Sequence, residues 1–358
     1  MNVNKLLLIL FSIATLYSCD MMKDDVDETY CGLFVNFKYD YNLQRADMFK
    51  DHVGGVTLFV FDSDGRFIKA YENNYIPQMG TLLYDGTYAY CMHITDLPDG
   101  NYRFIALANQ KPYLETLATS GPKYLRSELR TGDPMESLSV ALERKDGIVS
   151  NVAPMDTLWH GMTGAELINV KNVGYNVATI SMMRDTKMLT IGLHHLDADK
   201  QLDIAAEDFD FVIRDYNGRL AYNNSVVEEE PLLYTPFYKW DTYTKDEHGN
   251  SVDKTAHASI TFNRLMLHNS LHEDATLTII NKTDGKKVAE INLPEFLVQG
   301  RNAIDTYRYG SQEYLDRGYD FYMDFFLKGE EWYEVQLSVG VGLQILSWAR
   351  RIQRENIE

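Results

Sequence analysis

Residues 56–68 read Val-Thr-Leu-Phe-Val-Phe-Asp-Ser-Asp-Gly-Arg-Phe-Ile, from Val56 to Ile68. An apolar and β-branched segment leads into an Asp-Gly turn at Gly65, and a second apolar segment follows it. Because β-branched and aromatic residues favour extended backbone and glycine supplies the positive φ of a tight turn, this stretch predicts a β-hairpin.

A similar order of residues returns in the second half of the chain. Between Phe209 and Tyr222 an apolar segment is followed by Asp215, by Asn217-Gly218, by Arg219 and by another apolar segment. The recurrence predicts a second hairpin and two domains of similar design. Coincidence is the alternative, because Asp-Gly and Asn-Gly turns are common in hairpins.

Other parts of the chain carry the same strand signals. Residues 33–37 alternate between the two faces of a strand, residues 102–108 follow a Pro-Asp-Gly-Asn turn, and residues 276–291 form a third strand-turn-strand. Helical signals are short, at residues 47–53 and at residues 294–298, which begin with proline. Many short strands separated by turns predict an all-β protein made of two tandem β-sandwich domains with a few short helices.

The expected domain border lies where one predicted strand ends near residue 170 and the next begins at Val177. We therefore expect an N-terminal sandwich over residues 31–172 and a C-terminal sandwich over residues 173–358.

The N-terminus has the organisation of an export signal. Lys5 gives a positive start, and Leu6 to Leu16 form an apolar run that is too short to span a bilayer. The run ends in Leu16-Tyr17-Ser18-Cys19, which resembles the lipobox of bacterial lipoprotein signal peptides. We expect residues 1–18 to be removed and Cys19 to carry the lipid; an ordinary signal peptide with a chance cysteine is the alternative.

Composition limits what the exported protein binds. The chain has 34 basic and 52 acidic residues, and removing residues 1–18 takes away one lysine and no acid. This negative surface repels nucleic acid and anionic lipid headgroups, so we expect no nucleic-acid partner and membrane attachment through the lipid alone.

Residues 19–30 are acidic and read as a flexible tether. Lys23-Asp24-Asp25 within it resembles a surface-export signal, with an ordinary solvated charge run as the alternative.

Two cysteines remain once Cys19 is assigned to the lipid. Cys31 and Cys91 would both lie in an oxidising compartment, where an even pair is a disulfide candidate. We therefore expect a Cys31–Cys91 disulfide, with two buried free thiols as the alternative.

Motifs that carry chemistry are not evident in the sequence. His268 and His272 have a spacing that binds zinc only on a helix, whereas the sequence around them indicates a loop. His194 and His195 are adjacent on a predicted strand, so their side chains should point to opposite faces. We expect no enzyme, no cofactor and no metal site. The 24 tyrosines keep a glycan-binding surface open, although sandwich core and half-buried strand faces account for them more simply.

Several blocks resemble the FimB/Mfa-type fimbrium anchoring subunits, which are lipoproteins at the base of type V fimbriae. The resemblance is carried by the lipobox, by five further stretches in the same order and by Trp332 after them. The stretches are residues 31–39, 56–67, 291–297, 312–317 and 319–327. Gln312-Glu-Tyr-Leu-Asp-Arg317 is the most specific of them. One departure is that the family's Asn-Gly-Trp turn after the last long strand is replaced here by Val339-Gly-Val-Gly-Leu-Gln-Ile-Leu-Ser-Trp348.

The resemblance implies two transthyretin-like sandwiches and no enzymatic activity. It also implies a lipid-anchored protein of the outer membrane that attaches fimbriae made of pilin subunits and limits their length, and the tether predicts that the protein faces outward. A surface glycan-binding lipoprotein and a fimbrial tip or accessory subunit are the alternative functions.

The chain end offers a candidate contact for the fimbria. Six apolar residues alternate with polar residues and glycine, which predicts one long final strand with an overhang that pairs with another subunit. These residues are Val335, Leu337, Val339, Val341, Leu343 and Ile345. The alternative is that the whole run stays inside its own domain.

Overall fold

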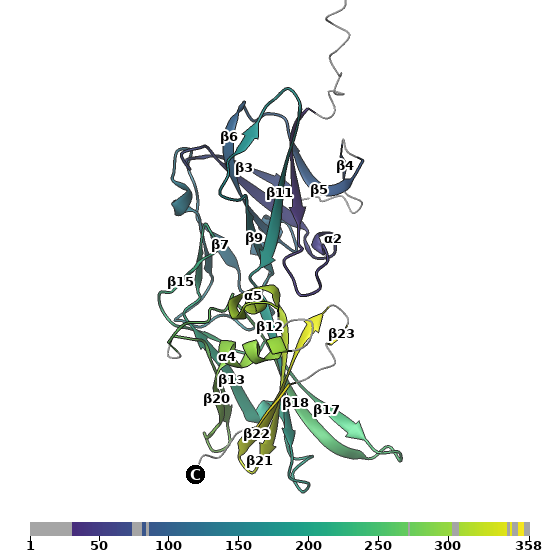
Figure 1. The fold of residues 1–358 in the computed structure, drawn as a ribbon. Helices are drawn as coiled ribbons and strands as arrows, with labels where there is room; N and C mark the ends of the chain where they lie inside the picture. The colour runs from purple at the N-terminus through teal and green to yellow at the C-terminus, as the bar shows by residue number, and fades with distance from the viewer. Residues whose placement is uncertain are drawn as a thin grey trace, which may run out of the picture.

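A computed structural model describes residues 31–73, 81–83, 86–270, 273–302, 308–341, 344–345 and 350–353. The described chain forms two β-sandwich domains that follow one another along the long axis of the molecule (Figure 1). Its α-helices are short: α2 (Phe49–His52), α3 (Tyr113–Leu117), α4 (Leu293–Gln299) and α5 (Ser311–Arg317). The predicted all-β class with two sandwiches is confirmed. Within these ranges, none of the helices has the length and apolar character needed to cross a bilayer.

The first domain is one nine-stranded sheet that bends back on itself, in the order β3-β2-β6-β9-β11-β1-β5-β4, with β10 beside β6. Its strands are β1 (Gly32–Lys38), β2 (Gly55–Phe61), β3 (Phe67–Asn73), β4 (Thr81–Leu82), β5 (Tyr88–Ile94), β6 (Gly100–Asn109), β9 (Leu158–Met162), β10 (Ile168–Val170) and β11 (Tyr175–Arg184). The bend lies where the end of β11 pairs with β9, at Met182 and Gly161. A Cβ on Gly161 would lie 2.6 Å from Ile180 Cγ2, so the corner requires glycine. The bend brings Val35 of β1 and Leu58 of β2 into one buried core.

The hairpin predicted from residues 56–68 is present as β2 and β3. Asp62 Oδ1 accepts hydrogen bonds from the backbone N–H of Asp64 at 2.9 Å and of Arg66 at 2.8 Å. Gly65 has a φ of +73°, which is the left-handed conformation that favours glycine in this turn.

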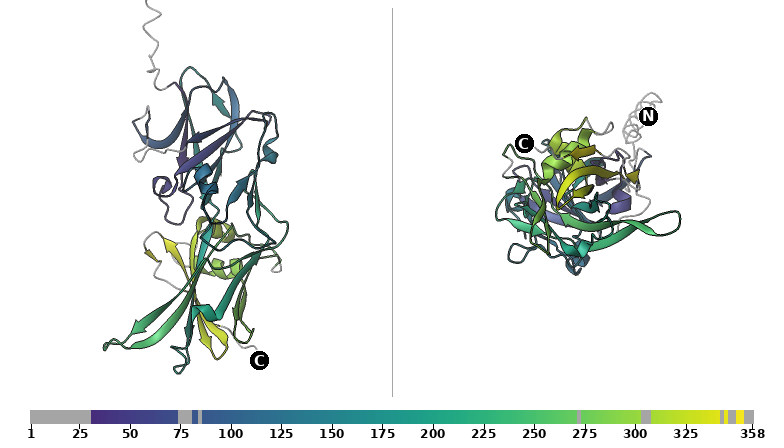
Figure 2. Two further views of the ribbon diagram at one scale, coloured as in Figure 1. Left: turned by 180° about the vertical axis from the view of Figure 1, so that it is seen from behind. Right: turned by 90° about the horizontal axis from the view of Figure 1, so that it is seen from below.

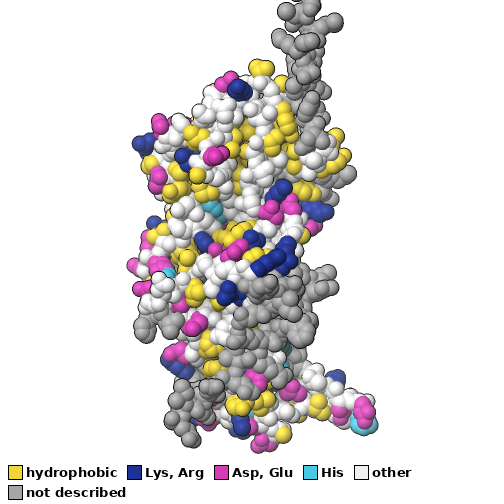
Figure 3. Space-filling view, in the orientation of Figure 1, with side chains coloured by type: hydrophobic (Ala, Val, Ile, Leu, Met, Phe, Trp, Pro, Cys, Tyr) yellow, Lys and Arg dark blue, Asp and Glu magenta, His cyan; other side chains and the backbone are white. Residues whose placement is uncertain are grey.

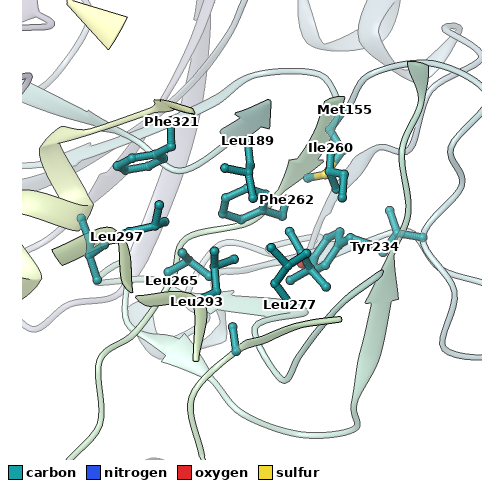
Figure 4. Packing of buried hydrophobic residues seen from close by; sticks show 14 of the residues in the cluster. Met155, Leu189, Tyr234, Ile260, Phe262, Leu265, Leu277, Leu293, Leu297 and Phe321 are labelled. Atoms are coloured by element: carbon teal, nitrogen blue, oxygen red, sulfur yellow. The ribbon is translucent and has the colours of Figure 1, made fainter. Parts of the chain in front are cut away.

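The second domain packs a seven-stranded sheet, β17-β18-β12-β21-β22-β23 with β24 beside β22, against the four-stranded sheet β16-β13-β19-β20. Its strands are β12 (Lys187–His195), β13 (Phe209–Asp215), β16 (Leu232–Tyr234), β17 (Tyr238–Lys245), β18 (Ser251–Phe262), β19 (Thr276–Asn281), β20 (Lys287–Asn292), β21 (Asp320–Lys328), β22 (Glu331–Val341), β23 (Gln344–Ile345) and β24 (Arg350–Gln353). Leu189, Phe262 and Phe321 of the larger sheet meet Leu277 of the smaller one in the core, which Leu293 of α4 helps to close (Figure 4).

The two domains repeat one design. In the first, β1 lies between antiparallel β5 and parallel β11; in the second, β12 lies between antiparallel β18 and parallel β21. The opposing layers β3-β2-β6-β9 and β16-β13-β19-β20 place β2 and β13 in equivalent positions. The similarity predicted from the two apolar segments before the turns is therefore real at the level of strand order.

The second hairpin, predicted over residues 209–222, is wrong. After β13 the chain leaves its sheet, and β14 (Arg219–Ala221) pairs with β8 (Ser139–Leu142) from the other side of the domain border. The physical reason is a buried side chain. Asn217 Nδ2 donates to the backbone carbonyls of Asn263 at 3.1 Å and Arg264 at 2.9 Å, which ties the predicted turn to the end of β18. The resulting small sheet, β15-β14-β8-β7, also contains β7 (Tyr124–Arg126) and β15 (Val226–Val227).

The domain border is also displaced from its predicted position. β11, which was expected to open the second domain, pairs with β1 and β9 and belongs to the first sheet. The chain passes between domains at Asp185-Thr186, directly before β12. Alternation over residues 177–181 identifies a strand correctly but contains no information about which sheet that strand joins.

The predicted unbroken C-terminal strand is wrong as well. β22 starts earlier than expected, at Glu331, and ends at Val341; β23 then folds back, with Ile345 opposite Gly340. Val335 and Leu337 are buried inside the sheet, between β21 and β24. Period-two alternation is the same in one long strand and in two strands joined by a turn. Leu343 lies outside the described residues, and the described pairing shows no overhang.

Candidate functional site

The expected disulfide is not formed, since Cys31 and Cys91 are both free thiols. Cys91 lies opposite Asn36 in the β1–β5 pair, whereas Cys31 precedes Gly32 at the other end of β1. Five residues of extended strand span roughly 16 Å, far beyond the Cα separation that a disulfide bridges. Cys19 lies outside the described residues.

The most specific sequence block, residues 312–317, forms helix α5 at the junction between the domains. Its Asp316 makes a two-pronged ion pair with Arg264, at 2.7 Å from Nε to Oδ1 and 2.8 Å from Nη2 to Oδ2. Both side chains are largely buried, with 7% exposure for Asp316 and 14% for Arg264. The pair therefore fixes α5 to the end of β18.

Lys187, the first residue of β12, is buried beside this pair. Its ammonium donates to three backbone carbonyls, those of Arg184 at 2.9 Å, Asp316 at 2.7 Å and Gly318 at 2.8 Å. Burial lowers the pKa of Lys187, and burial raises the pKa of the neighbouring Asp185 carboxyl. Because three carbonyls replace water around the ammonium, Lys187 is satisfied while buried and ties the start of β12 to the end of β11 and to α5.

Arginine side chains stacked on aromatic rings continue the junction into the first domain. The Arg184 guanidinium lies 4.3 Å from the ring centre of Tyr319, and that of Arg317 lies 4.1 Å from the ring centre of Tyr41. Gln44 Nε2 also donates to the Tyr319 hydroxyl at 3.0 Å. Charged side chains of both signs gather at this level of the molecule (Figure 3). The contacts join α5 and the loop after β1 into one packed unit.

A second candidate site lies on the outer face of the seven-stranded sheet. Tyr238 and Trp240 of β17 stack at 5.1 Å between ring centres, and Trp240 stacks on His257 of β18 at 4.9 Å, with ring planes within 19° and 12°. We call these three residues the ring ladder. Tyr238 is 57% exposed, and the β17–β18 hairpin extends away from the body of the domain (Figure 2).

Polar groups border the ring ladder on the same face. As predicted, His194 and His195 point to opposite faces; His194 lies on the outer face, stacked on Phe326 at 4.7 Å between ring centres. Thr255 Oγ1 lies 3.1 Å from His194 Nδ1, and Asp324 Oδ1 lies 3.4 Å from His194 Nε2. A flat aromatic surface beside hydroxyl, imidazole and carboxylate groups is suited to a ligand with both apolar and hydroxyl-bearing faces.

His268 is engaged in ion pairs. Its Nδ1 lies 2.8 Å from Asp274 and its Nε2 lies 2.5 Å from Glu228, and both carboxylates raise its pKa against the effect of desolvation. Nearby, burial raises the pKa of Asp215 to about 7. No group of side chains within the described ranges has the arrangement of a metal site, and His272 lies outside those ranges.

The profile of the fimbrillin-A associated anchor proteins Mfa1 and Mfa2 matches residues 26–353 of this sequence. The chain belongs to this family. Membership confirms the resemblance inferred from the sequence blocks. The family consists of fimbrial anchor proteins and is not an enzyme class.

Solved structures share the fold of this chain. A proposed adhesin from Bacteroides thetaiotaomicron is 26% identical, with a TM-score of 0.71 over 90% of this chain and 99% of its own. A proposed polysaccharide-binding protein from the same organism is 30% identical, with a TM-score of 0.68 over 91% and 99%. The fimbrial anchor protein Mfa2 from Porphyromonas gingivalis shares the fold at 16% identity, with a TM-score of 0.55 over 89% and 98%. No curated protein sequence gives a significant match.

Sequence reasoning singled out residues 312–317 through the resemblance, but it predicted no helix there and missed the residues around them. Lys187 begins an ordinary strand, and nothing in its neighbours indicates that its ammonium is buried. The ring ladder did leave a signal, because Tyr238 and Trp240 alternate with Lys239 and Asp241. The partnership with His257 depends on strand register, which the sequence alone does not provide.

Proposed function

We propose that this protein is a lipid-anchored fimbrial subunit that attaches fimbriae to the outer membrane and limits their length. The family match over residues 26–353 is the observation that carries the proposal, because it covers both domains and names fimbrial anchors. The lipobox at Cys19 supplies the attachment to the membrane, with the tether holding the protein on the outer surface.

The arrangement of the domains supports an anchor that is attached to the membrane at one end and contacts the fimbria at the other. β1 starts at Gly32, opposite Tyr175 at the start of β11, and β11 then runs toward the second domain. The tether therefore joins the first domain at the end farthest from the second. A protein held by its N-terminus presents the second domain outward, and we propose that pilin subunits contact that domain.

Cys19→Ala tests the attachment. The variant is expected to fold normally, to lose labelling by radioactive palmitate and to move from the membrane to the soluble fraction. Folding is checked by near-UV circular dichroism, and Cys31→Ala serves as the matched control that keeps both labelling and membrane association. A Cys19→Ala protein that stays with the outer membrane after a high-salt wash contradicts a lipid anchor.

Glycan binding is a second candidate function, favoured by the ring ladder. A relative of 30% identity is described as a proposed polysaccharide-binding protein, and stacked, half-exposed rings offer an apolar surface for the C–H face of a sugar. Electrophoresis in gels containing yeast mannan or gastric mucin tests this function. Retardation that disappears in Trp240→Ala, but persists in the control Tyr243→Ala on the opposite face of β17, supports binding. If the natural protein migrates equally in gels with and without mannan or mucin, it does not bind these two polysaccharides.

A further inference from the structure

Strand β1 has an unusual position for a first strand, because its hydrogen-bonded partner β11 is parallel to it. Seven residue pairs join them in unbroken register, from Gly32–Tyr175 to Lys38–Ser181. On its other side β1 pairs with antiparallel β5 over five residue pairs. β11 continues through Asp185-Thr186 directly into β12. In the second domain, β12 lies between β18 and β21.

Force on an anchor would enter and leave this sheet at opposite ends. This step rests on the proposed function, in which the tether is fixed to the membrane and the fimbria pulls on the second domain. The tether pulls β1 from its N-terminal end at Gly32, and the second domain pulls β11 from its C-terminal end at Arg184. Because the two strands are parallel, that load slides them past each other, and their cross-strand hydrogen bonds resist together instead of breaking one after another.

We propose that the first domain is a mechanical clamp in which β1 bears fimbrial tension in shear. Sliding β1 out also requires exposing its buried side chains. Leu33 and Val35 are fully buried and Phe37 is 3% exposed, and all three belong to the core of the first sandwich. Phe34, on the opposite face, stacks on His93 of β5 at 4.1 Å between ring centres.

Contacts at both ends of β1 strengthen the clamp. At the N-terminal end, Asn176 Nδ2 donates to the Gly32 carbonyl at 3.0 Å and the Gly32 N–H donates to the Gly174 carbonyl at 3.0 Å. At the C-terminal end, the Ser181 hydroxyl donates to the Asp40 carboxylate. These contacts join β1 to the same segment, residues 174–181, that transmits the load.

Side-chain contacts also hold the C-terminal end of β11, where the load passes to the second domain. Arg184, at the end of β11, is held by the ring of Tyr319, and Lys187 is held by three carbonyls of the junction. Tension leaving β11 therefore reaches α5 and the second sheet through packed side chains as well as through the backbone.

Single-molecule pulling of the full lipid-free chain in two geometries tests the clamp. In the native geometry one handle is attached in the tether, before residue 31, and the other at Glu247 in the exposed β17–β18 turn. In the control geometry the first handle is moved to the exposed Lys50, so that β1 is pulled from its C-terminal end and peels from β11. Urea unfolding shows whether both handle-bearing proteins are equally stable at equilibrium.

We expect the first domain to rupture at roughly twofold or higher force in the native geometry, because forced unfolding is governed by the unfolding barrier and not by equilibrium stability. The contour length released identifies which domain unfolded. Asn176→Ala should lower the native-geometry force and leave the control-geometry force unchanged. Equal rupture forces in the two geometries, or a weaker native geometry, overturn the clamp. Neither result depends on lipidation or on fimbriae, so failure here leaves the anchoring proposal to its own test.

Discussion

Replacing Asp316 by alanine removes one side of the buried ion pair at the domain junction and leaves Arg264 without its carboxylate. Asp316 accepts two charge-assisted hydrogen bonds from Arg264, and the remaining described partner of that guanidinium is the Asn224 carbonyl. Breaking a buried pair by deleting one partner costs about 3–5 kcal/mol, because a charge stays buried without compensation. The bond from Lys187 to the Asp316 backbone carbonyl is kept, so the expected loss comes from the side chain alone.

Urea unfolding of the lipid-free protein, followed by circular dichroism, measures this loss. Glu290→Gln is the control, since the Lys287–Glu290 pair is about half exposed and its removal should change stability by roughly 0.5 kcal/mol or less. Arg264→Met combined with Asp316→Leu removes both charges and should recover most of the loss. An Asp316→Ala protein as stable as the Glu290→Gln control would refute the assignment of the junction as a structural site.

Two further outcomes follow from the described side chains. Mass spectrometry of the lipid-free protein, unfolded without reductant and then alkylated, should show that both Cys31 and Cys91 are modified; a mass unchanged until reductant is added would restore the disulfide. Burial raises the pKa of Asp215 to about 7 from an ordinary value near 4, so the folded state keeps a proton that the unfolded chain releases, and the contribution of this group to stability falls as pH rises from about 4 through 7. Asp215→Asn should therefore gain stability relative to the natural protein between pH 4 and pH 8, by up to about 4 kcal/mol; a difference in urea midpoint that is constant with pH contradicts this.

The parts of the fold that sequence reasoning predicted are those that local chemistry determines. The hairpin at Gly65 follows from Asp62, whose carboxylate binds two backbone N–H groups within the turn itself. Asn217 is also a common turn residue, but its side-chain amide donates to the distant carbonyls of Asn263 and Arg264, and the predicted hairpin does not form. A turn residue thus predicts a turn only when its partners lie nearby in the sequence.

The remaining errors concern which strand lies beside which. The domain border, the Cys31–Cys91 pair and the last strand were all inferred from patterns that identify strands without placing them in a sheet. Strand β11 joins β1 across more than 130 residues, and that pairing determines the border. The ring ladder and the buried Lys187 depend on the same long-range register, so the sequence alone could not reveal them.

Counting fimbriae on cells and in the culture medium tests the central claim most directly. A strain lacking this gene would be complemented with the natural gene or with Cys19→Ala, and fimbriae would be counted and measured by electron microscopy in both fractions. Anchoring predicts that the natural gene keeps fimbriae short and on the cells, whereas Cys19→Ala sheds them into the medium at greater length. Fimbriae that stay attached to cells, with unchanged length, in the Cys19→Ala strain would contradict the account.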